Sequence, residues 1–122
     1  MKLVFDIDGV VCSNTWGKYA EAQPYPEMIK YINELYDAGN TITFYSARGF
    51  GSCRGNLMAI IATWFDFTND QLKGWGVKYH SLVLGKPDGA VYIDDRAFKV
   101  DDDGSSADQL RKGIDELLHH TS

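Results

Sequence analysis

The sequence predicts an α/β fold with a mostly parallel central sheet. Short β-rich apolar runs alternate with helix-period patterns, and no internal repeat or low-complexity linker interrupts them. Hydrophobic residues make up 44% and charged residues 24%, which is ordinary for a folded globular protein. Such alternation implies right-handed βαβ crossovers with helices on both faces of the sheet. With 122 residues, we expect a single domain spanning 1–122.

The first half of the chain predicts strand, helix and strand. Residues 2–7 (KLVFDI) form a short β-rich run. Residues 26–39 predict a helix with Pro26 at its start and Gly39 at its end. Residues 41–46 (TITFYS) predict a second, buried strand. The apolar face of the helix comprises Met28, Ile29, Ile32, Leu35 and Tyr36.

The second half continues the alternation. Residues 56–67 predict a helix packed on the sheet, and 69–76 predict a further short helix or turn. Two more strands are expected at 80–85 and 90–95. A closing amphipathic helix is expected at 106–120. Its inward side chains would be Leu110, Ile114, Leu117 and Leu118.

Polar residues follow each of the four predicted strands. The carboxyl ends of parallel strands share one edge of the sheet, where ligands of such folds bind. We therefore expect these side chains to gather at one site. They are Asp6 and Asp8, then Ser46 and Arg48, then Lys86, and finally Asp94 and Asp95.

This set of residues suits a magnesium ion and a phosphate. Four gathered carboxylates repel one another by several kcal/mol, so they need a bound cation or proton. Oxygen ligands without Cys or His favour Mg²⁺ over Zn²⁺. The Ser46 hydroxyl, the backbone N–H groups around Ala47 and Arg48, and the Lys86 ammonium are suitable donors for a phosphate.

Four ordered motifs resemble the signature motifs of the haloacid dehalogenase-like phosphohydrolases. They are DIDGV, YSARG, GKP and YIDD, and they span residues 3–96. Within that superfamily, PYPEMIKYINELYDAG, WGVKYHSLVLGKP and YIDDRA resemble small phosphatases associated with capsule and surface-polysaccharide gene clusters. The resemblance implies a three-layer, Rossmann-like fold. The stretches 9–45 and 47–85 leave no room for a cap domain, so we expect a site that is open or covered by the loop 10–25 or a neighbouring subunit.

The resemblance also implies roles for the individual residues. Asp6 would be the nucleophile that forms an aspartyl-phosphate, and Asp8 the general acid and base whose backbone carbonyl also binds the metal. Phosphate would be held by Ser46, Ala47, Arg48 and Lys86. Mg²⁺ would be held by Asp6, Asp8, Asp94 and Asp95. Which of the last two touches the metal directly is open, because the fourth motif has the compact Asp-Asp form.

The function that this implies is Mg²⁺-dependent hydrolysis of a phosphorylated sugar or related small metabolite, in polysaccharide precursor synthesis. Two alternatives stay open. One is a polynucleotide 3′-phosphatase or nucleotidase, since those enzymes share the motifs. The other is a non-catalytic Mg²⁺-binding or assembly protein with the same fold, which the intact Asp6 and Asp8 disfavour.

Composition and charge limit the partners. The net charge is −5 and no Lys or Arg cluster is present, which disfavours an extended nucleic-acid surface. No apolar run is long enough to span a bilayer and the N-terminus does not resemble a signal peptide, so we expect a cytoplasmic protein without membrane contact. The sequence leaves room for a homo-oligomer.

Several further residues admit a structural role. Cys12 and Cys53 are expected to be reduced thiols. Trp16, Tyr19 and Tyr25 either pack internally or form an aromatic flap that stacks on a sugar or base. Arg96 is expected to form an ion pair, with substrate contact as the alternative. Residues 101–108 predict a turn and N-cap rather than a calcium loop, and His119 and His120 suit a helix C-terminus.

Overall fold

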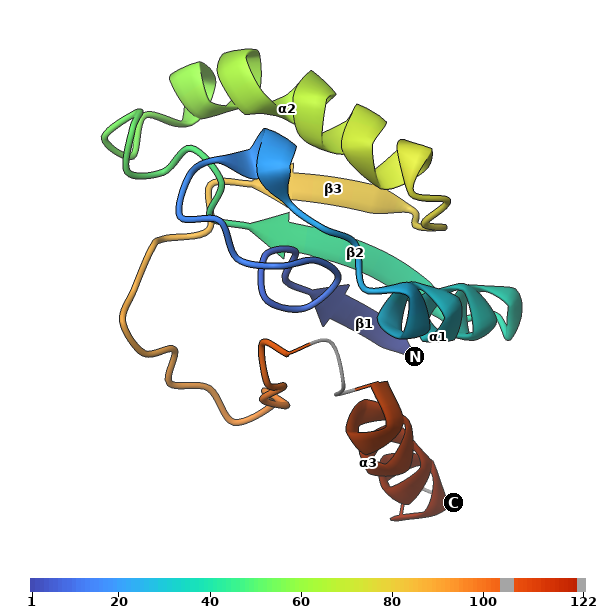
Figure 1. The fold of residues 1–122 in the computed structure, drawn as a ribbon. Helices are drawn as coiled ribbons and strands as arrows, with labels where there is room; N and C mark the ends of the chain where they lie inside the picture. Colours follow the sequence, from blue (N-terminus) through green and yellow to red (C-terminus); the bar gives the residue numbers. More distant parts are fainter. Residues whose placement is uncertain (104–106, 121–122) are drawn as a thin grey trace.

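The structure, a computed structural model, describes residues 1–103 and 107–120. Residues 104–106 of the turn and N-cap predicted at 101–108 lie outside the described residues, as do the side chains of Leu118, His119 and His120. Strands and helices alternate in the expected order (Figure 1). The elements are β1 (Lys2–Phe5), the 3₁₀ helix η1 (Tyr19–Glu21), α1 (Pro26–Asp37), β2 (Thr41–Ser46), α2 (Leu57–Gly74), β3 (Ser81–Leu84) and α3 (Ala107–His120).

The three strands form a parallel sheet in the order β1-β2-β3. Phe5 of β1 pairs with Phe44 of β2, and Phe44 pairs with Leu82 of β3. Parallel pairing brings the carboxyl ends of all three strands to the same edge, where their arrowheads point in Figure 1. This confirms the parallel α/β arrangement predicted for the first three strands.

Local signals set the ends of the helices. α1 begins at Pro26, whose fixed φ suits a first helical position, and Gly39, at φ 96°, follows its end. α2 begins after Asn56, whose side chain accepts a hydrogen bond from the backbone N–H of Ala59. α2 then continues for 18 residues, so the predicted helix and the separate segment at 69–76 are largely one helix.

The sheet buries one face and exposes the other. Phe44 is fully buried, whereas Val4 and Val83, which point to the opposite face, are 66% and 46% exposed. Two successive right-handed crossovers in the same direction place both connecting helices on one face, which explains this asymmetry. α3 packs against α1 through an ion pair between Arg111 and Glu34. The described residues therefore form two main layers, and the predicted third layer is not found among them.

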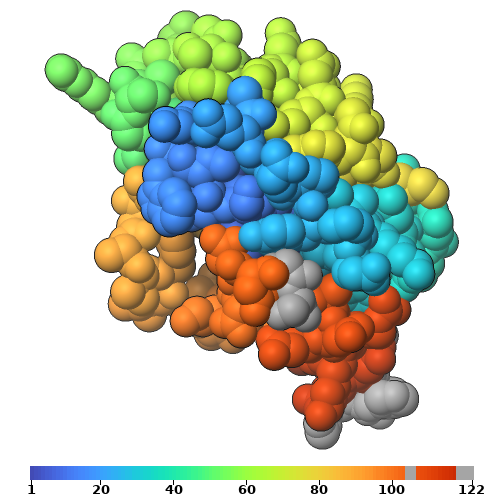
Figure 2. Space-filling view, viewed as in Figure 1, coloured from blue at the N-terminus to red at the C-terminus, as the bar shows by residue number. Residues whose placement is uncertain are grey.

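The predicted fourth strand at 90–95 is not present. Residues 85–103 contain no strand and form an exposed segment between β3 and α3 (orange in Figure 2). Only 85–89 separate β3 from this run, too few for the crossover of a dozen or more residues that a parallel strand needs. Tyr92 instead folds back, with its hydroxyl donating to the Pro87 carbonyl at 2.6 Å. Ile93 is consequently 97% exposed.

The exposed segment is attached to the rest of the molecule near its end. The Tyr25 hydroxyl donates a 2.6 Å hydrogen bond to Asp102, which also lies beside Gly9. In α3, Leu110 and Ile114 are buried as predicted, but Leu117 is exposed. Among the residues that the structure describes, no helix is both long enough and apolar enough to cross a membrane.

Candidate functional site

A cavity of about 640 Å³ opens at the carboxyl edge of the sheet. Its polar lining includes Asp6, Asp8, Arg48 and Asp88, which follow the ends of all three strands, and Ala47 lies beside them. Its aromatic lining comprises Trp16, Tyr19, Trp64 and Tyr92. The predicted edge of the sheet therefore does carry a cavity, with both carboxylates of the first motif in its wall.

Asp6 follows β1 directly, and its side chain is held by the adjacent Ile7 and by Lys86, which follows β3. The backbone N–H of Ile7 donates to Asp6 Oδ1 at 2.7 Å, and Lys86 Nζ lies 3.2 Å from Oδ2. Lys86 is fixed in turn, because its backbone N–H donates to the Ser46 carbonyl and its ammonium lies over the Tyr92 ring. The Asp6 side chain keeps 36% of its surface exposed. Asp6 is thus both oriented and accessible from the cavity.

Asp8 reaches the same cavity because the chain turns immediately after it. The buried Ile7 separates the two acids, and Gly9 takes a φ of 84° that glycine adopts most readily. The Gly9 N–H then donates to the Cys12 carbonyl at 2.8 Å, closing the turn. The expected convergence of Asp6 and Asp8 at Gly9 is therefore seen in the fold.

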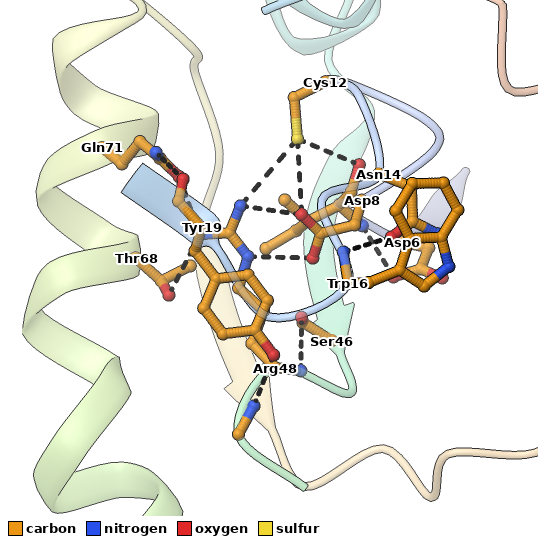
Figure 3. A network of polar contacts seen from close by, with 12 residues as sticks. Asp6, Asp8, Cys12, Asn14, Trp16, Tyr19, Ser46, Arg48, Thr68 and Gln71 are labelled. Carbon is orange, nitrogen blue, oxygen red and sulfur yellow. Dashed lines mark hydrogen bonds and ion pairs between the residues drawn. The ribbon is translucent and has the colours of Figure 1, made fainter. Parts of the chain in front are cut away.

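Arg48 forms an ion pair with Asp8. Its Nε lies 2.9 Å from Asp8 Oδ2 and its Nη2 lies 3.0 Å from Oδ1, a two-pronged ion pair (Figure 3). Its Nη1 donates to Gln71 at 2.7 Å and to Thr68 at 3.4 Å, both on α2. The Arg48 side chain is 0% exposed. Its guanidinium is directed at Asp8 and α2. The phosphate contact expected from the sequence uses the backbone N–H groups around Ala47 and Arg48, and it stays a prediction.

Ser46 and Ala47 occupy different positions at the same strand end. Ser46 is fully buried and its hydroxyl oxygen accepts a 3.1 Å hydrogen bond from the Arg48 backbone N–H, so it braces the loop. Ala47 lines the cavity. Of the four expected phosphate-binding residues, Ala47 and Arg48 line the cavity, whereas Ser46 and Lys86 do not.

Cys12 is buried beside Asp8 and does not line the cavity. Its Sγ lies 3.6 Å from Asp8 Oδ1 and 3.8 Å from Arg48 Nη2. Burial, and then the negative charge of Asp8, raise the pKa of the Cys12 thiol to about 12. Both cysteines are free, as predicted, and Cys12 is held in its protonated form.

Asp94 and Asp95 do not line the cavity. They lie in the exposed segment, where Asp94 Oδ1 accepts a 2.7 Å hydrogen bond from the Arg96 backbone N–H. Within the described parts of the chain, no group of three or more acidic, His or Cys side chains is close enough to hold a metal. The four-carboxylate shell expected from the sequence is thus not assembled, for the same reason that the fourth strand is not formed.

The sequence analysis missed several cavity residues, among them Asp88 and Trp64. Asp88 comes two residues after Lys86, so the rule that polar residues at strand ends form the site could have found it. Trp64 comes from the middle of α2 and was read only as part of an apolar helix. No sequence signal distinguishes it, because its position at the cavity depends on how α2 crosses the sheet.

The loop 10–25 borders the cavity, as expected for a protein without a cap domain. The Tyr19 hydroxyl accepts a 2.9 Å hydrogen bond from the Gly49 backbone N–H, and the Tyr19 ring lies against Trp64 and over Arg48. Trp16 is 86% exposed, at a φ of 50° that is uncommon for a large side chain. The loop therefore has one packed aromatic residue and one that projects at the mouth of the cavity.

Comparison with known proteins supports the fold and gives no function. No family model matches the sequence, and no curated protein matches it. A crystal structure of a structural-genomics target from Vibrio cholerae is similar to it, with 26% sequence identity and a TM-score of 0.75. The similarity covers 93% of this chain and 98% of that one. The chain is therefore similar over nearly its whole length to that protein from Vibrio cholerae.

Proposed function

We propose that the chain is a Mg²⁺-dependent phosphomonoesterase that acts on a small phosphorylated metabolite, such as a sugar phosphate, in the cytoplasm. The observation that carries the proposal is the ion pair between Lys86 and Asp6, which lie 80 residues apart in sequence, because Asp6 lines a cavity that Asp8 also lines. Asp6 is the most exposed of these groups and is suited to attack a phosphorus atom in line.

The reaction proceeds in two displacements. An Asp6 oxygen bonds to phosphorus while the bond to the ester oxygen breaks, and that oxygen leaves with the electron pair and a proton from Asp8. A water molecule, losing its proton to Asp8, then attacks phosphorus and releases Asp6 and inorganic phosphate. Lys86 lies close enough to Asp6 to offset negative charge on the transferred group.

The donor set is compatible with magnesium. Mg²⁺ binds through one or two carboxylates together with waters and substrate phosphate oxygens. Asp6 and the backbone carbonyl of Asp8 would hold it together with water and phosphate oxygens. The sequence motif also assigns Asp94 or Asp95 to this shell, but both lie in the exposed segment and outside the cavity lining. The bound ion would supply charge neutralisation for the phosphoryl oxygens.

The cavity favours a small substrate. Its volume of about 640 Å³ is in the range of small-molecule sites, and its aromatic walls suit the ring of a sugar. The net charge of −5 disfavours an extended nucleic-acid substrate. A role in polysaccharide precursor synthesis remains part of the proposal and is supported only by the sequence resemblance.

Phosphate release from a panel of sugar phosphates, nucleotides and a 3′-phosphorylated oligonucleotide, with and without Mg²⁺, tests the proposal. Asp6→Asn should reduce release by about 10³-fold or more. The matched control is Asp37→Asn, because Asp37 also pairs with a lysine, Lys78, at 2.8 Å, but outside the cavity. Preference for the oligonucleotide would favour a polynucleotide 3′-phosphatase. No release of phosphate by folded wild-type protein would favour a non-catalytic Mg²⁺-binding or assembly protein.

A further inference from the structure

Arg48 is the most completely enclosed charged side chain near the cavity. Its guanidinium contacts both oxygens of Asp8, the Gln71 side-chain carbonyl and the Thr68 hydroxyl, while its Cζ lies 4.7 Å from the centre of the Tyr19 ring. Arginine carries five N–H donors in a fixed plane and no acceptor. The orientation of that plane is therefore set by residues on α2 and η1, and it sets the orientation of Asp8.

The parts that hold Arg48 are themselves connected. Gln71 accepts from Arg48 through its carbonyl oxygen and donates through its amide nitrogen to the Tyr19 backbone carbonyl at 2.8 Å. Tyr19 covers the guanidinium and accepts from the Gly49 N–H, one residue beyond Arg48. Figure 3 shows Arg48 between Asp8 on one side and Gln71 and Thr68 of α2 on the other.

This arrangement leaves Asp8 able to act, whereas Arg48, although it lines the cavity, directs its N–H donors at Asp8, Cys12 and α2. Asp8 Oδ1 accepts from Arg48 and from the Cys12 thiol, whereas Oδ2 accepts from Arg48 and retains a further lone pair. The Asp8 side chain is 17% exposed, whereas that of Arg48 is 0% exposed. A phosphate group could bind the guanidinium only by displacing Asp8.

We propose that Arg48 is a positioning residue that fixes the Asp8 carboxyl group at the angle required for proton transfer, an assignment that rests on the proposed phosphatase function. In that reaction Asp8 gives its proton to the leaving oxygen and later takes one from water. Arg48 exchanges no proton and makes no contact with the substrate. Its planar pair of donors holds both oxygens of Asp8, which the single ammonium of a lysine does not reproduce.

The leaving group distinguishes this role from direct phosphate binding. The parameter kcat/KM reports steps up to release of the first product, and an alkyl phosphate needs a proton on its leaving oxygen whereas p-nitrophenyl phosphate does not. Arg48→Lys should lower kcat/KM for an alkyl phosphate such as a sugar phosphate by about a hundredfold and for p-nitrophenyl phosphate by less than about threefold. The inhibition constant of inorganic phosphate should change by less than about twofold, since Arg48 does not bind phosphate.

Arg111→Lys is the matched control, because Arg111 also pairs with a carboxylate and lies over a tyrosine ring, away from the cavity. It should leave both esters unaffected. If Arg48→Lys does not fold, Gln71→Leu removes the 2.7 Å bond that anchors Arg48 and should give the same selective loss, about tenfold. In an Asp8→Asn background, Arg48→Lys should cause no further loss on the alkyl ester, because both changes remove the same proton transfer.

An equal loss on both esters, or weaker inhibition by inorganic phosphate, would show that Arg48 binds the phosphoryl group and would overturn the assignment alone. Multiplicative losses in the double variant would also overturn it. If the wild-type protein hydrolyses neither ester, the proposed function fails and this assignment fails with it.

Discussion

Two arginines in this chain make the same kind of contact in different surroundings. Arg48 pairs with Asp8 at 2.9 Å under the ring of Tyr19, and Arg111 pairs with Glu34 at 2.7 Å over the ring of Tyr31. We call these the Arg48 cluster and the Arg111 cluster. The Arg48 side chain is 0% exposed, whereas that of Arg111 is 42% exposed. The same three chemical groups therefore form a fixed support in one place and a surface link between α1 and α3 in the other.

Burial, and not the ion pair itself, therefore decides whether such a cluster fixes a geometry or only links two helices at the surface. A surface pair competes with water and contributes between 0 and about 1 kcal/mol. A buried pair has lost its hydration, so removing one partner leaves the other charge without compensation. The Arg48 cluster is therefore expected to hold a geometry, while the Arg111 cluster can be broken at little cost.

The largest expected effect concerns stability. Arg48→Met should lower the free energy of unfolding by about 3–5 kcal/mol, because Asp8 would remain buried without its partner. Arg111→Met should lower it by no more than about 1 kcal/mol. Urea unfolding of the two variants beside the wild type measures the difference. Equal losses would contradict the contrast between the two clusters.

The next effect concerns the thiol in the Arg48 cluster. With its pKa raised to about 12, Cys12 should react with a thiol reagent near neutral pH more than about a hundredfold slower than the partly exposed Cys53. Labelling of the variants Cys12→Ser and Cys53→Ser assigns each rate. If Cys12 were labelled as fast as Cys53 in the folded protein, the buried surroundings of Cys12 and Asp8 would be accessible to the thiol reagent.

A smaller effect is expected from salt. Raising sodium chloride to about 1 M should remove most of the roughly 0.5 kcal/mol of coupling between Arg111 and Glu34, since exposed pairs are screened. The coupling between Arg48 and Asp8 should change far less. Double-mutant cycles in urea at low and high salt measure both coupling energies. Similar salt dependence for the two pairs would place Arg48 in contact with solvent.

The smallest effect concerns Tyr31 in the Arg111 cluster. Burial, and then the charge of Asp115, raise the pKa of Tyr31, while the Arg111 cation opposes this. The raised pKa means that the folded state holds the proton more tightly, so this contribution to stability is present below the unfolded pKa near 10 and is lost as the pH rises through the folded pKa. Arg111→Met should move the titration of Tyr31 to still higher pH. Ultraviolet difference titration measures it, with Tyr31→Phe identifying the signal.

How far the sequence predicts this structure depends on whether a pattern is local. The run TITFYS forms β2 over Thr41–Ser46 as expected, and Pro26 starts α1 as expected. The run at 90–95 has the same β-rich character but forms no strand. Its composition favours a strand, while the short connection after β3 does not provide the crossover. Composition alone therefore could not predict whether residues 90–95 form a strand.

The site shows the same division. Asp6 and Asp8 reach one cavity because a strand end and a glycine turn, both visible in the sequence, place them there. The orientation of Arg48 depends on Gln71, which comes from α2 and is brought close only by tertiary packing. Sequence motifs thus predicted that Asp6 and Asp8 gather, but they wrongly added Asp94 and Asp95 and could not predict which side chains contact one another.

The hydrogen bonds that attach η1 to its surroundings have a consequence for the timing of the proposed reaction. Tyr19 is joined to Gly49 and to Gln71 by contacts within the chain, so this wall of the cavity is ordered when the protein folds. The entropy of ordering it is then not incurred again at each encounter with a substrate. We expect turnover to be free of the microsecond-to-millisecond closing step that governs enzymes with moving lids, and to be limited by chemistry or by release of phosphate.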